Sequence, residues 1–225
     1  MRLYCRDPDP QTRFLPDRSN CRRKPLHGTP PILSVTYRRA ARAWPPGELA
    51  AVYRAAADRG AKTTHLDRER LATDPVGPLS SAVPWLARLA GAVHVLHVLP
   101  EPVGDRVADG REIAANLFAA VDQAATGAVY LCDLALTGAK RGDPVADWVS
   151  YAVEQASDAL PRLSYTARPP SLIAHTEEAA RCLAVAIDHA HADPSAAPSA
   201  IADALGHLLV VSAITDTAYE RQSGG

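Results

Sequence analysis

The sequence predicts an all-α protein, built as a mostly antiparallel bundle of about five long helices with one or two short helices near the N-terminus. Residues 109–139 carry apolar side chains at steps of three and four, the repeat of a helix that is buried along one side. Further segments show the same period, and no segment sustains the alternation of a strand. Short links between these segments favour antiparallel neighbours.

The first 34 residues differ in composition from the rest of the chain. They hold six prolines without helical or strand periodicity, which predicts a disordered or loosely attached basic arm, residues 1–34, before a single helical domain, residues 35–225. Residues 1–44 carry ten Arg or Lys and three Asp, whereas the remainder carries fourteen basic and twenty-two acidic residues. Such an arm is expected either to meet an anionic partner or to fold back on its own acidic body.

The N-terminal part of the domain is expected to hold the shorter helices. The first of them ends at Gly60, because glycine commonly follows the last helical turn. A second short piece, residues 66–72, is closed off by Asp74 and the proline after it. A stronger helix then covers residues 81–99, with large apolar side chains along one side.

The long helix, residues 109–139, is expected to begin with an Asp109 cap. Gly127 near its middle bends or weakens it without dividing it, because the apolar stripe continues in phase. Asp122 and Asp133 are expected on the opposite, solvated face. The stripe consists of Ile113, Leu117, Val121, Ala124, Ala128, Leu131 and Ala135.

Three helices complete the predicted bundle. The first covers residues 143–161, from an aspartate cap to a proline stop. The second covers residues 172–191 and exposes Glu177 and Arg181, which can pair at i and i+4. The third, residues 198–221, is apolar around most of its circumference, which predicts a place in the middle of the bundle or at a subunit contact.

Composition limits the function classes. No window of eighteen uninterrupted apolar residues occurs, so a soluble, cytoplasmic protein without a membrane anchor is expected. Arginine greatly outnumbers lysine, as expected of a protein from a GC-rich bacterial genome. The four cysteines form no Cys-x-x-Cys pair and are expected to be free thiols. Cys5, Cys21 and His27 could supply three zinc ligands, but their spacing matches no zinc finger and a fourth ligand is missing. Phosphate loops, dinucleotide-binding glycines and serine elbows are absent.

Histidine supplies the candidate metal ligands. His94 and His97 lie one turn apart, and Asp203 and His207 share a helix face at i and i+4. Facing helices can bring two such pairs to one divalent transition metal, provided that the four side chains converge within about 5 Å. The alternative is ordinary surface or boundary histidines that bind nothing.

Two features bear on nucleic acid. Arg38, Arg39 and Arg42 form a basic patch beside a tryptophan, which predicts either contact with nucleic acid or another anion, or an anchor onto the body. Arg88 and His94 resemble, in type and spacing, an arginine and histidine pair of one family of helical-bundle ribonucleases, which implies RNA cleavage. A leucine follows this arginine where that family usually has a polar residue, and chance spacing is the alternative.

No motif names a function. The leading hypothesis is a helical-bundle protein that acts by binding, as a regulatory or scaffold component, through a protein partner or self-association of the C-terminal helix. The alternative is a small metal-dependent enzyme or ligand-binding bundle, with no cofactor predicted beyond a divalent transition metal. Ser212, Thr215 and Asp216, on the buried side of the last helix, either line a ligand pocket or bond back to the preceding turn.

Overall fold

The computed structural model describes residues 44–66, 74–98, 107–139, 145–162 and 170–219. These residues form helices and no strand, so the all-α prediction is confirmed for them. The predictions for the N-terminal arm, for Arg38, Arg39 and Arg42, and for the two N-terminal cysteines lie outside the described residues. The helices are α2 (Pro46–Thr64), α4 (Val76–Val98), α5 (Val107–Ala139), α6 (Val145–Arg162), α7 (Pro170–Ala192) and α8 (Ala197–Tyr219).

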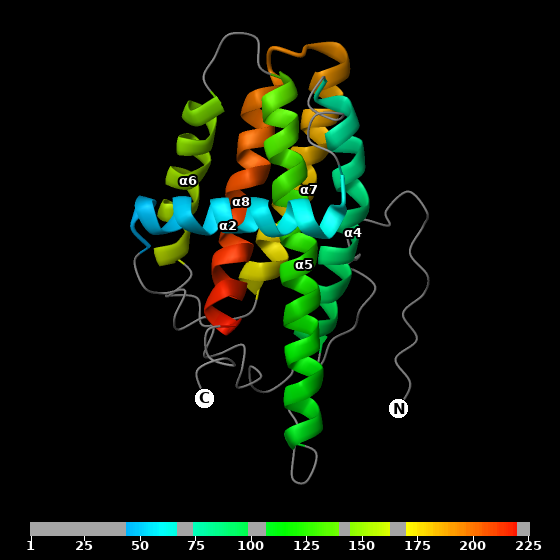
Figure 1. Ribbon diagram of the computed structural model, residues 1–225, viewed down its shortest axis with the longest axis vertical. Coiled ribbons are helices and arrows are strands. Elements are labelled where there is room, and N and C mark those ends of the chain that lie inside the picture. Colours follow the sequence, from blue (N-terminus) through cyan, green and yellow to red (C-terminus); the bar gives the residue numbers. More distant parts are fainter. Residues whose placement is uncertain (1–43, 67–73, 99–106, 140–144, 163–169, 220–225) are drawn as a thin grey trace.

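Five helices, α4 to α8, lie side by side, and α2 crosses them (Figure 1). The N-terminal helix α2 was expected to be short, but at 19 residues it is longer than α6, which has 18. α5 and α8 are the central pair, flanked by α4 on one side and α6 on the other. α7 packs against both α4 and α8, and α2 packs on α5, α8 and α6. Successive long helices alternate in direction, so α4 and α5, and also α7 and α8, are antiparallel (Figure 1). The predicted, mostly antiparallel bundle is therefore confirmed.

α8 is the most deeply buried helix. Every residue from Ala200 to Thr215 is buried except Asp203 and His207, which are half-buried. Helices of the same chain cover its apolar surface, so its composition needs no second subunit, and self-association stays a prediction. α4 and α8 are long and apolar enough to cross a membrane by length and composition alone. The share of the window buried inside the fold is 33% for α4 and 78% for α8, and the larger value is that of a core helix.

α5 is one continuous helix of 33 residues, as expected, but it is buried on more than one side. Every residue from Ala124 to Leu136 is buried, because α2, α4 and α8 surround this stretch. The expected solvated face is therefore wrong. Asp133 is buried and accepts a hydrogen bond from the Tyr53 hydroxyl of α2. The Asp122 side chain is 16% exposed and lies 3.4 Å from the Arg59 guanidinium.

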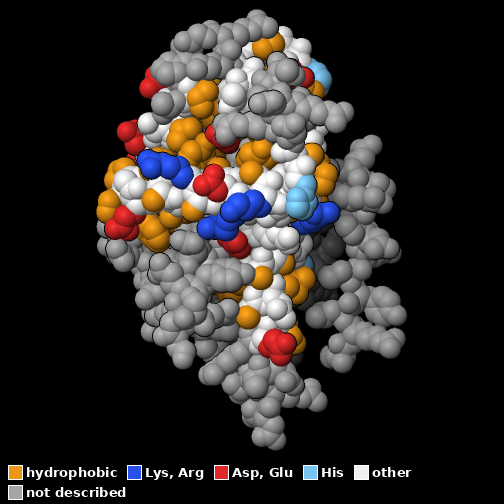
Figure 2. All heavy atoms as spheres, viewed as in Figure 1, with side chains coloured by type: hydrophobic (Ala, Val, Ile, Leu, Met, Phe, Trp, Pro, Cys, Tyr) orange, Lys and Arg blue, Asp and Glu red, His pale blue; other side chains and the backbone are white. Residues whose placement is uncertain are grey.

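α2 continues past its predicted stop. It runs to Thr64 and ends at His65, which adopts the left-handed conformation with φ 52°. Gly60 instead marks the crossing with α5, because a Cβ there would overlap the Thr126 carbonyl oxygen and lie 2.6 Å from Tyr130 Cβ. The glycine thus permits close approach of two helices. The face that carries α2 intersperses basic and acidic side chains, without a surface of one sign (Figure 2).

α4 and α5 begin earlier than predicted. Asp74 opens α4, since its Oδ1 accepts a hydrogen bond of 2.7 Å from the Val76 amide. The short piece predicted at residues 66–72 lies, apart from Leu66, outside the described residues. α5 begins at Val107, two residues before the expected Asp109 cap. Ile113, expected in the buried stripe, is 49% exposed, because the first turns of α5 project past the neighbouring helices (Figure 1).

Candidate metal centre

A tight hairpin connects α7 and α8. Asp193 organises its turn: Oδ1 accepts hydrogen bonds from the amide and hydroxyl of Ser195, at 3.2 and 2.6 Å, and the carbonyl accepts one of 3.0 Å from the Ala196 amide. In an antiparallel pair, residues equally far from the turn lie opposite each other. Cys182 of α7 and His207 of α8 meet this condition, since each lies ten residues from its end of the turn. The hairpin therefore determines which polar side chains of the two helices meet.

His175, Glu178, Cys182 and His207 form what we call the α7–α8 cluster. The first three occupy one face of α7, at i, i+3 and i+7. One ligating atom each of Glu178, Cys182 and His207 lies within 4.8 Å of the other two. Within the described part of the chain, this is the one group of three His, Cys, Asp or Glu side chains so close together. Nδ1 of His175 lies 2.8 Å from Nδ1 of His207.

Burial keeps both histidines of the cluster neutral. It is the main cause that lowers the pKa of His175 from 6.5 to about 4, and the neighbouring His207 lowers it further. Burial also lowers the pKa of His207. At 2.8 Å, one ring must donate its Nδ1 proton to the lone pair of the other. Neutral imidazole is the form that ligates metals.

Arg181 lies beside the cluster on the solvent side. Its Nε donates to Glu178 Oε2 at 2.7 Å, and its Nη2 lies 3.7 Å from Cys182 Sγ. Glu178 is thus the partner of this arginine, where Glu177 was expected. Burial raises the pKa of the Cys182 thiol although the arginine opposes the shift, which argues against a reactive nucleophile. The Arg181 guanidinium therefore already contacts two of the three side chains that could ligate a metal, those of Glu178 and Cys182.

Asp203 and His207 share a face of α8, as predicted, but they have different neighbours. The Asp203 carboxylate accepts a hydrogen bond of 3.2 Å from the Tyr151 hydroxyl of α6. His207 turns to α7 and enters the cluster. α6 and α8 approach closely at Gly206, where a Cβ would lie 3.3 Å from the Ala152 carbonyl oxygen. Asp203 therefore ties α8 to α6 at the edge of the site.

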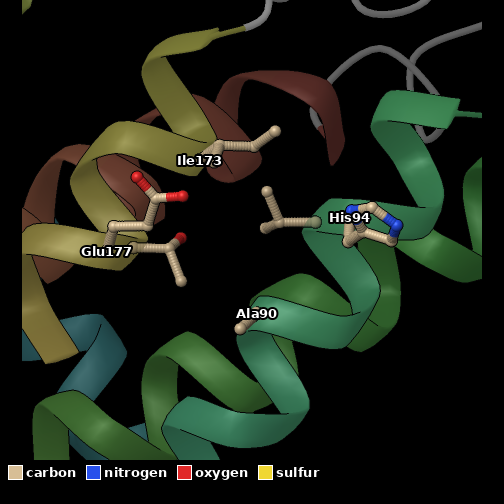
Figure 3. A pocket seen from close by; sticks show the side chains of 6 residues that line it. Ala90, His94, Ile173 and Glu177 are labelled. Atoms are coloured by element: carbon tan, nitrogen blue, oxygen red, sulfur yellow. The ribbon is translucent and has the colours of Figure 1, made fainter. Parts of the chain in front are cut away.

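His94 lies at a different place, between α4 and α7. It and Ala90 line one side of a small cavity, and Ile173 and Glu177 line the other (Figure 3). The cavity volume is about 10 Å³, which holds about one water molecule. A small-molecule ligand does not fit there.

The other hypotheses that involve α4 and α8 fare differently. His94, His97, Asp203 and His207 do not form one ligand group among the described residues. The Arg88 guanidinium packs over the Trp85 ring, 4.8 Å from its centroid, so it does not share the α4–α7 cavity with His94. The RNA-cleavage hypothesis stays untested.

The polar residues of the last helix fit the alternative reading in part. Thr215 Oγ1 donates to the carbonyls of Val211 and Ser212, at 3.1 and 2.9 Å, as expected of a threonine that bonds back to the preceding turn. Ser212 is fully buried, and its hydroxyl has no hydrogen-bond partner among the described residues. The side chain of Asp216 lies outside the described residues.

Comparison of the chain with protein-family models, curated proteins and solved structures finds no match.

The metal-free protein is expected to lose stability on acidification. The unfolded chain takes up a proton at His175 near pH 6.5, whereas the folded chain does so only near pH 4. Between these values the unfolded state binds more protons, so the contribution is present above pH 6.5 and is lost as the pH falls to 4. Burial lowers the pKa of His207 too, so it acts in the same direction, while the charge of Glu178 partly opposes the shift of both histidines. The full shift of His175 corresponds to about 3 kcal/mol.

Urea unfolding of the metal-free protein at pH 7.5 and at pH 4.5 measures this change. His175→Gln is expected to flatten the pH dependence, whereas His191→Gln, at an exposed position of the same helix, is the matched control. An undiminished pH dependence in His175→Gln would contradict the assignment.

Proposed function

We propose that the protein binds a divalent transition metal, zinc first, through Glu178, Cys182 and His207. The observation that supports this is the approach of three chemically different ligand atoms to within 4.8 Å of one another. Tetrahedral zinc, with bonds of about 2.0–2.3 Å, separates its ligand atoms by roughly 3.4–3.8 Å. Small rotations of three side chains bring the cluster to that geometry.

The donor set favours zinc over other metals. Magnesium and calcium prefer oxygen ligands alone, and a thiolate sulfur does not suit them. Zinc accepts sulfur, imidazole nitrogen and carboxylate oxygen together. Three protein ligands leave one position for a water or another ligand, as in sites that exchange ligands rather than sites that only stabilise a fold.

His175 supports this arrangement from outside the ligand set. Its Nδ1 holds Nδ1 of His207 at 2.8 Å, which leaves Nε2 of His207 as the nitrogen for the metal. Metal-bound histidines usually bond through their second nitrogen to such a partner, which fixes the tautomer and the ring orientation. The pair of histidines therefore suits one ligand and one orienting group.

Calorimetric titration of the chelator-treated protein with Zn²⁺ tests the proposal. We expect one ion bound per chain with a Kd below about 1 μM, and about 4 kcal/mol of added stability at a free zinc concentration of about 1,000 Kd. Glu178→Gln is expected to weaken binding strongly, whereas Glu154→Gln, an exposed carboxylate of α6, is not. Absence of stoichiometric uptake of zinc, and also of cobalt, would overturn the proposal.

A further inference from the structure

We infer that the metal site takes a small anionic ligand with two oxygens, a carboxylate or a phosphate group, held between the metal and Arg181. This inference rests on the proposed metal site, and it assigns the fourth coordination position and a role for the arginine.

Access to the metal position is from the Arg181 side. The side chains of Arg181 and Glu178 are 63% and 47% exposed, whereas the Cys182 residue is 4% exposed. His175 and His207 are half-buried between the two helices. Because the described ligand group supplies three atoms, the fourth position of a tetrahedral ion is open, and an incoming ligand reaches it past the arginine.

The positive charge nearest the open position belongs to Arg181. The Glu178 carboxylate and a Cys182 thiolate offset the two charges of the ion, while His207 is neutral. The Asp203 carboxylate balances Arg181 over the site as a whole, because its hydrogen bond from the neutral Tyr151 hydroxyl leaves its charge in place. An incoming anion therefore meets the guanidinium first, at a site without excess negative charge.

Metal binding also frees the donors of the arginine. In the metal-free protein, Nε donates to Glu178 at 2.7 Å and Nη2 lies 3.7 Å from Cys182 Sγ. A metal draws both of these groups to itself, and the guanidinium, on the residue before Cys182, stays within reach. Its planar donors match carboxylate and phosphate oxygens in pairs.

The test uses the cobalt-loaded protein, whose visible spectrum reports changes in coordination. Inorganic phosphate and acetate are titrated separately at constant ionic strength, and a saturable spectral change in the millimolar range is expected. Arg181→Gln is expected to keep cobalt binding and to lower the affinity for the anion by about 10- to 100-fold. This is the loss typical of a hydrogen bond to a charged group. Arg54→Gln, an exposed arginine of α2, is the matched control.

Each outcome separates the two proposals. Failure to bind cobalt or zinc overturns the metal site and this inference together. Cobalt binding with a spectrum that neither anion changes overturns this inference alone. Equal anion affinity in Arg181→Gln overturns the role of the arginine. A response to one anion only supports the inference and identifies the ligand class.

Discussion

Replacement of Cys182 by serine is expected to weaken zinc binding by more than about 100-fold. Loss of a partner outside the ligand set alone typically costs 10- to 100-fold in affinity, and this change removes a ligand. Zinc binding displaces the proton of the Cys182 thiol and leaves a thiolate ligand. A serine hydroxyl keeps its proton, so it does not replace this thiolate. The fold should tolerate the change, because the two side chains are similar in size. Calorimetric titration with Zn²⁺ measures the affinity.

Cys132→Ser is the matched control for this variant. Cys132 is also buried, at 1% exposed, but it lies on α5 outside the ligand group, and burial is the main cause that raises the pKa of its thiol to about 12. Its replacement is expected to leave the zinc affinity unchanged. If both variants lost affinity equally, or if Cys182→Ser kept it, Cys182 would not be a ligand. Thermal unfolding of both metal-free variants checks that they are folded.

Replacement of Gly60 by alanine is expected to lower the free energy of unfolding by about 2–4 kcal/mol. The new Cβ would meet the Thr126 carbonyl and lie 2.6 Å from Tyr130 Cβ, and neither is the free end of a flexible side chain. α2 must then move away from α5, which also strains the contact between Tyr53 and Asp133. Urea unfolding measures the loss.

The sign of this effect is what makes it informative. In an exposed helix, Gly→Ala normally stabilises a protein by about 0.5–1 kcal/mol. Gly91 of α4 is such a position, since a Cβ there meets nothing within 4 Å. Gly91→Ala is therefore expected to stabilise the same protein that Gly60→Ala destabilises. A neutral or stabilising Gly60→Ala would show that α2 does not cross α5 as closely as described.

The helices were predictable because burial along one side leaves a period of 3.6 residues in the sequence. The number of helices that surround each helix was not predictable, because the period reveals that one face is buried and does not show how many neighbours bury the helix. α5 shows the difference: three helices surround its middle, so Asp133 is buried although it lies opposite the apolar stripe. Gly60 was misread for a similar reason, since a glycine at a helix crossing and a glycine at a helix end look alike in sequence.

The candidate site was predictable only in part. His207 was found through its i, i+4 spacing from Asp203, but its partners on α7 were missed, because His175, Glu178 and Cys182 carry no adjacent motif. The turn at Asp193 was a usable signal. Had the two helices been paired about it, Cys182 would have been placed opposite His207. His94 lines a cavity with Ile173 and Glu177 of α7, and none of these residues belongs to the α7–α8 cluster.

X-ray absorption by the zinc-loaded protein identifies the atoms that coordinate the ion. We expect a coordination shell with one sulfur at about 2.3 Å and three nitrogen or oxygen atoms at about 2.0–2.1 Å, one of them from imidazole. Cys182→Ser should remove the sulfur. A shell of nitrogen and oxygen alone in the wild-type protein, with no sulfur neighbour, would contradict a metal site on the α7–α8 hairpin.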